Sequence, residues 1–253
     1  MGVTSSNKTV DVTEIDCDGS VKITLALSAS PDIVENPTDI VLVLDRSGSM
    51  TGAPLANIKA GAKKFVDIID EATDSSQDGN IGSGSRIGIV SFAETATANT
   101  PLITSVADLK SAIDSLTAGG STNHADAFEK AISLFDPMSA NGKVIVMFTD
   151  GNTTSGGPAA PVADSAKAMG ILIYCIGLIG SDGVNVATLE AWASQPASSY
   201  VVVTPDDGDL EQIFADLAAN ISKPGATDIV IDETLNPGFS ILSVGSPDKG
   251  NVT

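Results

Sequence analysis

The sequence is poor in basic residues, cysteine and histidine, and it lacks an apolar run long enough to cross a membrane. It contains 13 lysines and arginines against 32 aspartates and glutamates, which gives a formal net charge of -19. Because a field of that sign repels phosphate backbones and anionic lipid headgroups, nucleic acid and membrane insertion are excluded from the expected interactions. The longest apolar run, residues 171–176, has the length of a strand, whereas a spanning helix needs about 20 residues.

Cys17 and Cys175 are the only cysteines, and their spacing fits neither a zinc motif nor a redox CxxC motif. One disulfide between them, in an oxidising compartment, is compatible with the sequence. Two unrelated thiols are equally compatible, because Cys175 lies in an apolar run, where buried free cysteine is common. The sequence leaves both alternatives open.

The two ends of the chain bear on its location. The first residues contain no basic and apolar signal segment, which fits either a cytoplasmic protein or a secreted one whose signal peptide lies outside this chain. The end at Thr253 follows soon after a strand-like run, which favours a piece of a longer protein. We expect an extracellular or cell-surface location, with signal peptide and anchor outside this piece.

From residue 38 the chain alternates between strand-like and helix-like segments. Its 253 residues, of which 42% are hydrophobic, are enough for a substantial core. The alternation predicts an α/β fold with a doubly wound, mostly parallel six-stranded sheet flanked by helices. The expected strands cover residues 40–44, 86–92, 102–103, 143–149, 170–178 and 200–203, and the expected helices cover residues 54–70, 106–116, 125–135, 161–169, 186–193 and 210–221.

Both ends of the chain carry β-type patterns in place of this alternation. Residues 8–15 and 20–29 show mostly period-two hydrophobic spacing, which predicts an antiparallel hairpin with one buried face. Strand-like runs return at residues 227–231 and 239–244. We therefore expect a small antiparallel β domain formed by residues 1–37 and 224–253, with the α/β domain of residues 38–223 inserted between its halves.

The first buried strand ends in a cluster of oxygen-bearing side chains. Five apolar residues at 40–44 are followed by Asp45, Ser47 and Ser49 at alternate positions. Open α/β sheets place their ligand sites at the carboxyl ends of strands, and alternate residues of an extended segment point the same way. One metal ion could therefore reach all three side chains. Taken alone, this stretch is equally compatible with a helix N-cap, for which serine and aspartate are good residues.

Two further loops carry oxygen atoms to the same expected edge of the sheet. Thr122 lies in a glycine-rich loop between two expected helices, and Asp150 follows the buried strand at residues 143–149. Hydroxyl and carboxylate oxygens are hard ligands, which favour Mg²⁺, Mn²⁺ or Ca²⁺ over zinc or copper. Because three of the five side chains are neutral hydroxyls, much of the ion's charge would remain uncompensated. A sixth position is then suited to a carboxylate from another molecule.

These three loops together resemble a known family, the von Willebrand factor type A domain. The matching stretches are DRSGSM at residues 45–50, GGSTN at residues 119–123 and FTDG at residues 148–151. The resemblance covers roughly residues 38–223 and implies a metal-ion-dependent adhesion site, abbreviated MIDAS. It implies direct metal binding by Ser47, Ser49 and Thr122, with Asp45 and Asp150 acting largely through water. The family usually has threonine directly after the two glycines, so Ser121 remains an alternative to Thr122.

The resemblance implies a binding module rather than an enzyme. We expect a divalent-cation-dependent adhesion module that captures an acidic residue of a protein partner, within a bacterial cell-surface or pilus-type protein. The alternative is an intracellular scaffold that uses the same site in a protein complex. A metal-dependent hydrolase is less favoured, because it needs a general base near the ion. Only Asp45, Asp150 or the sole histidine, His124, which we expect in the loop beside the site, could serve.

Overall fold

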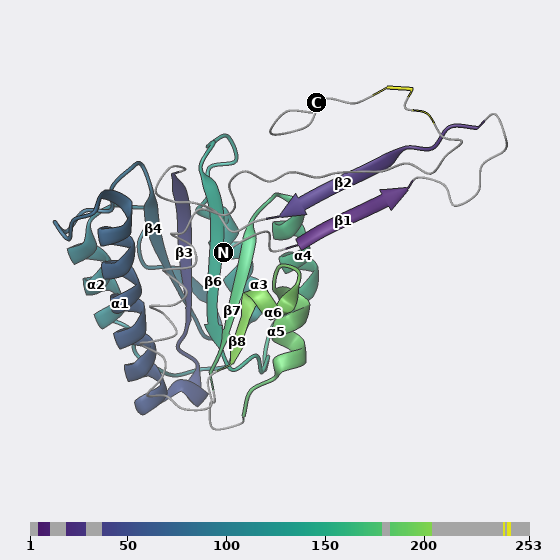
Figure 1. Ribbon diagram of the computed structural model, residues 1–253. Coiled ribbons are helices and arrows are strands. Elements are labelled where there is room, and N and C mark those ends of the chain that lie inside the picture. The colour runs from purple at the N-terminus through teal and green to yellow at the C-terminus, as the bar shows by residue number, and fades with distance from the viewer. Residues whose placement is uncertain are drawn as a thin grey trace.

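The computed structural model describes residues 5–10, 19–28, 37–178 and 183–203, together with residues 240 and 242–243. Its main feature is a six-stranded sheet in the order β5-β4-β3-β6-β7-β8 (Figure 1). All neighbouring strands are parallel except β4 and β5, which confirms the predicted doubly wound, mostly parallel sheet. The strands are β3 (Thr38–Asp45), β4 (Arg86–Phe92), β5 (Ala96–Ala98), β6 (Gly142–Thr149), β7 (Leu172–Gly177) and β8 (Val201–Val203).

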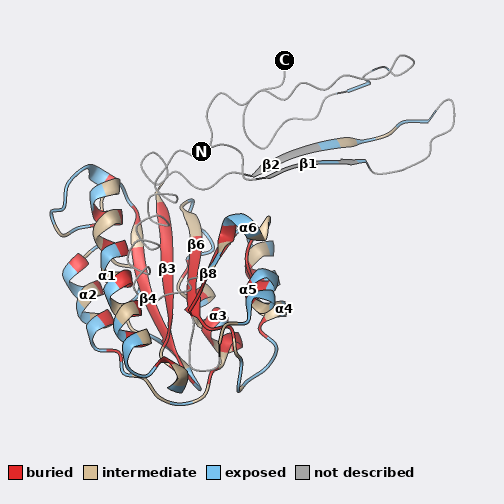
Figure 2. Ribbon diagram, turned by 60° about the horizontal axis from the view of Figure 1, so that its bottom comes forward, coloured by how far each residue is buried: buried red, intermediate tan, exposed pale blue. Residues whose placement is uncertain are grey.

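Helices cover both faces of this sheet. One group, α1 and α2, packs together on one face, and α3, α4 and α5 gather on the other (Figures 1 and 2). The predicted helix at residues 210–221 lies outside the described residues. The helices are α1 (Ala53–Asp74), α2 (Val106–Asp114), α3 (His124–Ser133), α4 (Ala160–Ala168), α5 (Val186–Trp192) and the short α6 (Ala197–Tyr200), and a 3-10 turn, η1 (Gly48–Met50), precedes α1.

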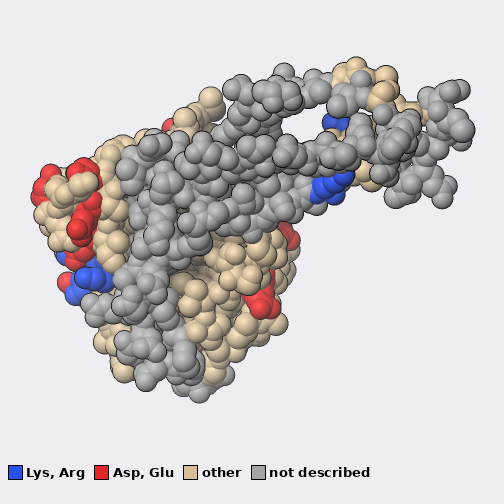
Figure 3. All heavy atoms as spheres, in the orientation of Figure 1, with Lys and Arg blue, Asp and Glu red and all other residues tan. Residues whose placement is uncertain are grey.

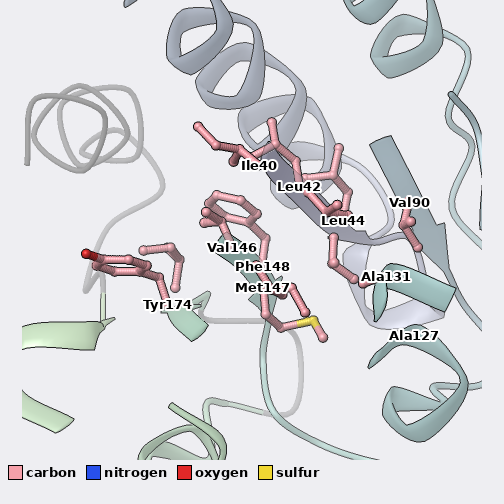
Figure 4. Close-up of a cluster of buried hydrophobic side chains, with 14 of the residues drawn as sticks. Ile40, Leu42, Leu44, Val90, Ala127, Ala131, Val146, Met147, Phe148 and Tyr174 are labelled. Atoms are coloured by element: carbon pink, nitrogen blue, oxygen red, sulfur yellow. The ribbon is translucent and has the colours of Figure 1, made fainter. Parts of the chain in front are cut away.

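The register of the sheet determines which side chains face which helices. Leu42 pairs with Val146, and both point toward α1, whereas Met147 points to the opposite face (Figure 4). Val43 pairs with Met147 and therefore shares its face. All eight residues of β3 are buried, because the strand has a neighbour on each side and helices above and below. This arrangement confirms the strand predicted at residues 40–44.

The predicted short strand at residues 102–103 is wrong. The strand that pairs with the free edge of β4 is β5, and Ile103 forms only an isolated bridge with Ile87. A tight turn at residues 93–95 returns the chain directly onto β4, closed by a hydrogen bond from Ala93 N to Thr95 O. Pro101 then interrupts the edge, because proline has no backbone donor for a ladder.

The N-terminal region contains the predicted antiparallel strand pair. Strand β1 (Ser5–Val10) pairs with β2 (Ile23–Ser28), with Val10 opposite Ile23. The expected strand at residues 227–231 and half of the one at residues 239–244 lie outside the described residues, so the division into an inserted domain and a two-part β domain stays a prediction. Among the described residues, no helix is long and apolar enough to span a bilayer.

Cys175 is a free thiol with no exposed surface in the middle of β7. A disulfide needs a second cysteine with its Cα within about 7 Å. Cys17 lies outside the described residues, so the choice between a disulfide and two unrelated thiols stays a prediction. Burial raises the pKa of this thiol to about 12, so it is neutral and unreactive at physiological pH.

An ion pair between the buried Asp39 and the partly exposed Arg86 joins the amino ends of neighbouring strands, at the edge opposite the candidate site. The fully buried Asp39 carboxylate accepts hydrogen bonds from Arg86 Nε at 2.9 Å and Arg86 Nη2 at 2.7 Å. Asn141 Nδ2 donates a third bond to Asp39 Oδ1 at 3.0 Å. The bidentate geometry and the third donor compensate for most of the cost of burying the carboxylate.

Replacing Arg86 with alanine is expected to lower the free energy of unfolding by about 2 kcal/mol. The buried Asp39 carboxylate would then keep only Asn141 as a side-chain hydrogen-bond donor. Urea denaturation measures the change. Lys63→Ala is the matched control, since Lys63 forms a more exposed pair with Asp114 at 2.7 Å and should cost under about 1 kcal/mol. Equal losses in the two variants would contradict the role given to the buried pair.

Candidate metal centre

Three loops meet at the carboxyl edge of the sheet. Strands β3 and β6 are parallel neighbours, so the residues that end them, Asp45 and Thr149, come to the same edge. The loop at residues 119–123 is joined to the end of β3 by two backbone hydrogen bonds. Gly48 N donates to Gly120 O at 2.9 Å, and Gly119 N donates to Arg46 O at 2.8 Å.

The close approach of the first two loops favours glycine at both contact points. A Cβ on Gly48 would lie 3.3 Å from the carbonyl oxygen of Gly120. Gly120 itself has φ of +88°, a backbone conformation that other residues rarely adopt. The glycines of both motifs therefore serve to bring the loops together.

Asp45 is fully buried, and the protein orients both of its carboxylate oxygens. Its Oδ1 accepts a hydrogen bond from Ser47 N at 2.8 Å, and its Oδ2 accepts one from Thr149 Oγ1 at 2.7 Å. Burial is the main cause that raises the pKa of Asp45 to about 6, and the nearby charge of Asp150 raises it further. Because burial disfavours the ionised form of this carboxyl group, a nearby cation would stabilise it.

The hydroxyl groups of Ser47 and Ser49 lie side by side, with 3.1 Å between the two Oγ atoms. Adjacent ligands of an octahedral Mg²⁺ ion, each at 2.0–2.1 Å from the metal, are separated by about 3 Å. The pair thus has the spacing that two neighbouring Mg²⁺ ligands need. Ser47 is buried and Ser49 is half-buried, so the pair lies at the surface end of the cluster.

Thr122 and Asp150 are connected through the loop that follows β6. Thr122 N donates to Thr154 Oγ1 at 2.8 Å, and Thr122 O accepts from Thr154 N at 3.0 Å. Asp150 is buried, and its Oδ1 accepts from Asn152 N at 2.9 Å. Ser121, the alternative ligand, is half-buried, whereas Thr122 is buried among these bonds.

The donor set fits a hard divalent cation. The predicted residues Asp45, Ser47 and Ser49 form one hydrogen-bonded cluster, Asp150 lies close enough to affect the pKa of Asp45, and Thr122 is bonded to the Asp150 loop. In the part of the chain that the structure describes, no three His, Cys, Asp or Glu side chains converge as a metal site. Such a hydroxyl-rich set with two carboxylates suits Mg²⁺ or Mn²⁺ better than zinc.

An acidic cluster of the described surface lies elsewhere. Figure 3 shows acidic side chains gathered at the carboxyl end of α1, where burial raises the pKa of Asp70 and the charges of Asp78, Asp74 and Asp67 raise it further. Besides Asp45 and Asp150, the three candidate loops carry one charged side chain, Arg46, and Glu94 lies in the turn between β4 and β5. The local field at the site therefore comes mainly from the candidate ligands.

The prediction that His124 lies in a loop beside the site is wrong. It is the first residue of α3, not a loop residue, and its side chain has no exposed surface. Its Nε2 lies 2.7 Å from Thr149 Oγ1 and its Nδ1 lies 2.8 Å from Thr153 Oγ1. Burial lowers the pKa of His124 to about 3, so the imidazole is neutral. Neither nitrogen is available as a general base for a substrate.

The raised pKa of Asp45 predicts how the metal-free protein responds to pH. A carboxyl whose pKa rises from 3.8 to about 6 on folding destabilises the protein most above pH 6, and this destabilisation decreases progressively as the pH falls from 6 toward 3.8. Between pH 7 and pH 5 this one group should stabilise the chelated protein by about 1 kcal/mol.

Urea denaturation in EDTA at pH 7 and pH 5, in the wild type and in Asp45→Asn, isolates this contribution. The stabilisation on acidification should be smaller in the variant by about 1 kcal/mol, because its side chain does not titrate. The same pH response in both proteins would show that Asp45 is not a strained carboxylate.

Comparison with known proteins shows what this chain is similar to. The von Willebrand factor type A domain family matches residues 39–216. Matrilin-1 from Mus musculus is 28% identical over 176 residues, which cover 65% of this chain and 32% of matrilin-1. The chain spans about a third of the length of the curated relatives of this kind that it matches.

Two solved structures illustrate the likeness of the fold. The vWF domain of the type V pili tip protein Mfa5 from Porphyromonas gingivalis has a TM-score of 0.65 at 17% identity, covering 78% of this chain and 100% of that domain. Proximal thread matrix protein 1 from the mussel byssus, in a structure with a zinc-occupied MIDAS motif, has a TM-score of 0.57 at 23% identity, covering 77% of this chain and 49% of that one.

Proposed function

This chain belongs to the von Willebrand factor type A domain family, and from that premise we propose that it binds a protein partner through a divalent cation held by its three loops. The single observation that carries the proposal is the pair of Ser47 and Ser49 hydroxyls, 3.1 Å apart beside the buried Asp45 carboxylate. Its relatives include matrilins and a pilus tip protein, which supports protein–protein interaction as the general role.

The residues divide into two roles in this proposal. Ser47, Ser49 and Thr122 bind the cation directly, and the carboxylates of Asp45 and Asp150 accept hydrogen bonds from its water ligands. When bound, the cation supplies a Lewis-acidic position for one carboxylate oxygen of the partner. Three neutral hydroxyls leave most of the cation's charge for that carboxylate, and this favours capture of an aspartate or glutamate. The ion that best fits the serine spacing is Mg²⁺, with Mn²⁺ as a close substitute.

The arrangement supports binding rather than turnover. Hydrolysis at the cation needs a general base within hydrogen-bond reach of an attacking water. His124 is fully buried with both ring nitrogens engaged, which removes the one imidazole from that role. We therefore infer an adhesion module of a bacterial surface or pilus-type protein, a setting like that of the Porphyromonas gingivalis pilus tip protein whose domain has a similar fold.

An array of peptides tests the proposal without knowledge of the natural partner. Each aspartate- or glutamate-containing peptide is paired with its asparagine or glutamine counterpart, and binding is measured in Mg²⁺ and again in EDTA. The proposal expects Mg²⁺-dependent binding to acidic members and none to their amide counterparts. Binding that is undiminished in EDTA, or equal for both members of each pair, would overturn it.

Substitutions at adjacent positions decide between the two candidate ligands of the second loop. Thr122→Val keeps the shape of the side chain but removes its hydroxyl, and we expect it to weaken Mn²⁺ binding by about 10–100-fold. Ser121→Ala is the matched control and should change the affinity by less than about threefold. Titration with Mn²⁺, followed by electron paramagnetic resonance of the free ion, measures both affinities. The reverse order of effects would assign the ligand to Ser121.

A further inference from the structure

The geometry points to a positioning residue behind the metal loops. We propose that His124 holds the three loops at the spacing of a Mg²⁺-sized ion, and that it thereby selects Mg²⁺ over the larger Ca²⁺. The inference rests on the proposed metal site but adds a residue that is not itself a ligand. It follows from the sheet register, from a directed chain of hydrogen bonds and from the packing around the imidazole.

The register brings the relevant side chains to one face of the sheet. Asp45 pairs with Phe92 of β4, and Leu44 pairs with Phe148, so Asp45 lies beside Thr149. Neighbouring residues of paired strands point to the same face. Asp45, Phe92 and Thr149 therefore face α3, and the first residue of α3 is His124.

The hydrogen bonds fix the tautomer of the imidazole. The hydroxyl of Thr149 has one hydrogen, which it donates to Asp45 Oδ2 at 2.7 Å. Thr149 Oγ1 must then accept at its contact with His124 Nε2, so Nε2 carries the ring proton. His124 Nδ1 is left as an acceptor, and Thr153 Oγ1 donates to it at 2.8 Å. The chain runs in one direction, from Thr153 through His124 and Thr149 to Asp45.

This chain connects all three metal loops through one side chain. Thr149 orients the carboxylate of the first loop, and Thr153 belongs to the loop that carries Asp150. The backbone of His124 itself follows Thr122 by two residues, so its position also fixes the second loop. Gly151 N adds a fourth tie, because it donates to Thr149 Oγ1 at 3.1 Å.

The packing around His124 leaves the ring no freedom to move. Its ring centroid lies 4.6 Å from that of Trp192 and 5.2 Å from that of Phe92. The side chain is fully buried, so water cannot replace its hydrogen bonds. An imidazole confined in this way makes the spacing between the loops rigid.

Rigidity has different consequences for different ions. Mg²⁺ requires near-ideal octahedral geometry at 2.0–2.1 Å, whereas Ca²⁺ accepts six to eight ligands at 2.3–2.6 Å in flexible arrangements. Loosening the loops should therefore weaken Mg²⁺ binding more than Ca²⁺ binding. The ratio of the two affinities is a readout that general destabilisation of the fold does not produce.

Three variants test the proposal. His124→Leu removes both hydrogen bonds and replaces the imidazole with an apolar side chain of similar size. His124→Gln restores a donor that can reach Thr149 Oγ1 from the position of Nε2. Thr153→Val removes only the bond to Nδ1, and because Thr153 is exposed this variant should fold even if His124→Leu does not. Mg²⁺ and Ca²⁺ affinities are measured by competition with Mn²⁺, with thermal unfolding in EDTA as the check on folding.

We expect His124→Leu to lose about 10–100-fold in Mg²⁺ affinity and less than about fivefold in Ca²⁺ affinity. His124→Gln should recover Mg²⁺ affinity to within about threefold of the wild type, and Thr153→Val should lose about three- to tenfold. An unchanged Mg²⁺ affinity in folded His124→Leu and Thr153→Val, or equal losses for both ions, would overturn the inference and leave the proposed function intact. Absence of Mn²⁺ binding by the wild type would overturn both.

Discussion

Replacing Asp45 with asparagine is expected to weaken Mg²⁺ binding by about 100-fold or more, and to abolish Mg²⁺-dependent binding of acidic peptides. The substitution keeps the size of the side chain and removes the charge that sits beside the Ser47 and Ser49 hydroxyls. Loss of an outer partner of a metal typically costs 10–100-fold, and Asp45 also supplies half of the carboxylate charge of the set. Isothermal titration with Mg²⁺ measures the affinity directly.

Asp108→Asn is the matched control for this experiment. Asp108 is exposed on α2, so the variant removes one negative charge from the chain without touching the three loops. Its Mg²⁺ affinity should stay within about twofold of the wild type, because charges separated by more than a Debye length are largely screened. Similar losses in the two variants would show that net charge, not a site at Asp45, governs metal binding.

Replacing Trp192 with alanine is expected to have the largest effect on stability, lowering the free energy of unfolding by about 3–5 kcal/mol. Trp192 is buried on α5, and its ring contacts His124 at 4.6 Å and Phe128 at 5.7 Å between centroids. Truncation removes the indole ring that packs against the His124 imidazole and leaves a cavity under α3. Urea denaturation in EDTA gives the change without a contribution from bound metal.

Trp192→Phe is the control for size, and it should cost less than half as much because it retains an aromatic contact with His124. If the account is right, Trp192→Ala at temperatures where it is folded should also bind Mg²⁺ more weakly than Trp192→Phe. A loss of less than about 1 kcal/mol in Trp192→Ala would mean that the space behind the loops is not tightly packed.

The parts of the fold that the sequence predicts correctly are those controlled by local patterns. Residues 40–44 are apolar without interruption, which is typical of a strand buried on both faces, and Asp45 follows at once. The three oxygen-bearing loops follow from local patterns as well, since each directly follows or links regular elements. Order along the chain then placed them at one edge of the sheet, as parallel topology demands.

The parts that the sequence did not predict depend on contacts between distant segments. The burial of His124 comes from Trp192 on α5 and Phe92 on β4, and no local pattern around residue 124 reports either one. The role of Thr149 is predictable from the sequence, because pairing of the two buried strands places it beside Asp45. Residues 96–98, and not residues 102–103, form the strand at the edge of β4, because a tight turn precedes them and Pro101 interrupts the edge.

The central claim is that one divalent cation binds between the three loops, and anomalous diffraction from a crystal grown with Mn²⁺ tests it most directly. The account predicts one strong anomalous peak at the carboxyl edge of the sheet, within about 2.0–2.4 Å of the hydroxyl oxygens of Ser47, Ser49 and Thr122. Asp45 and Asp150 should contact its water ligands. A peak only elsewhere, such as at the acidic end of α1, or no peak with Mn²⁺ present in excess, would contradict it.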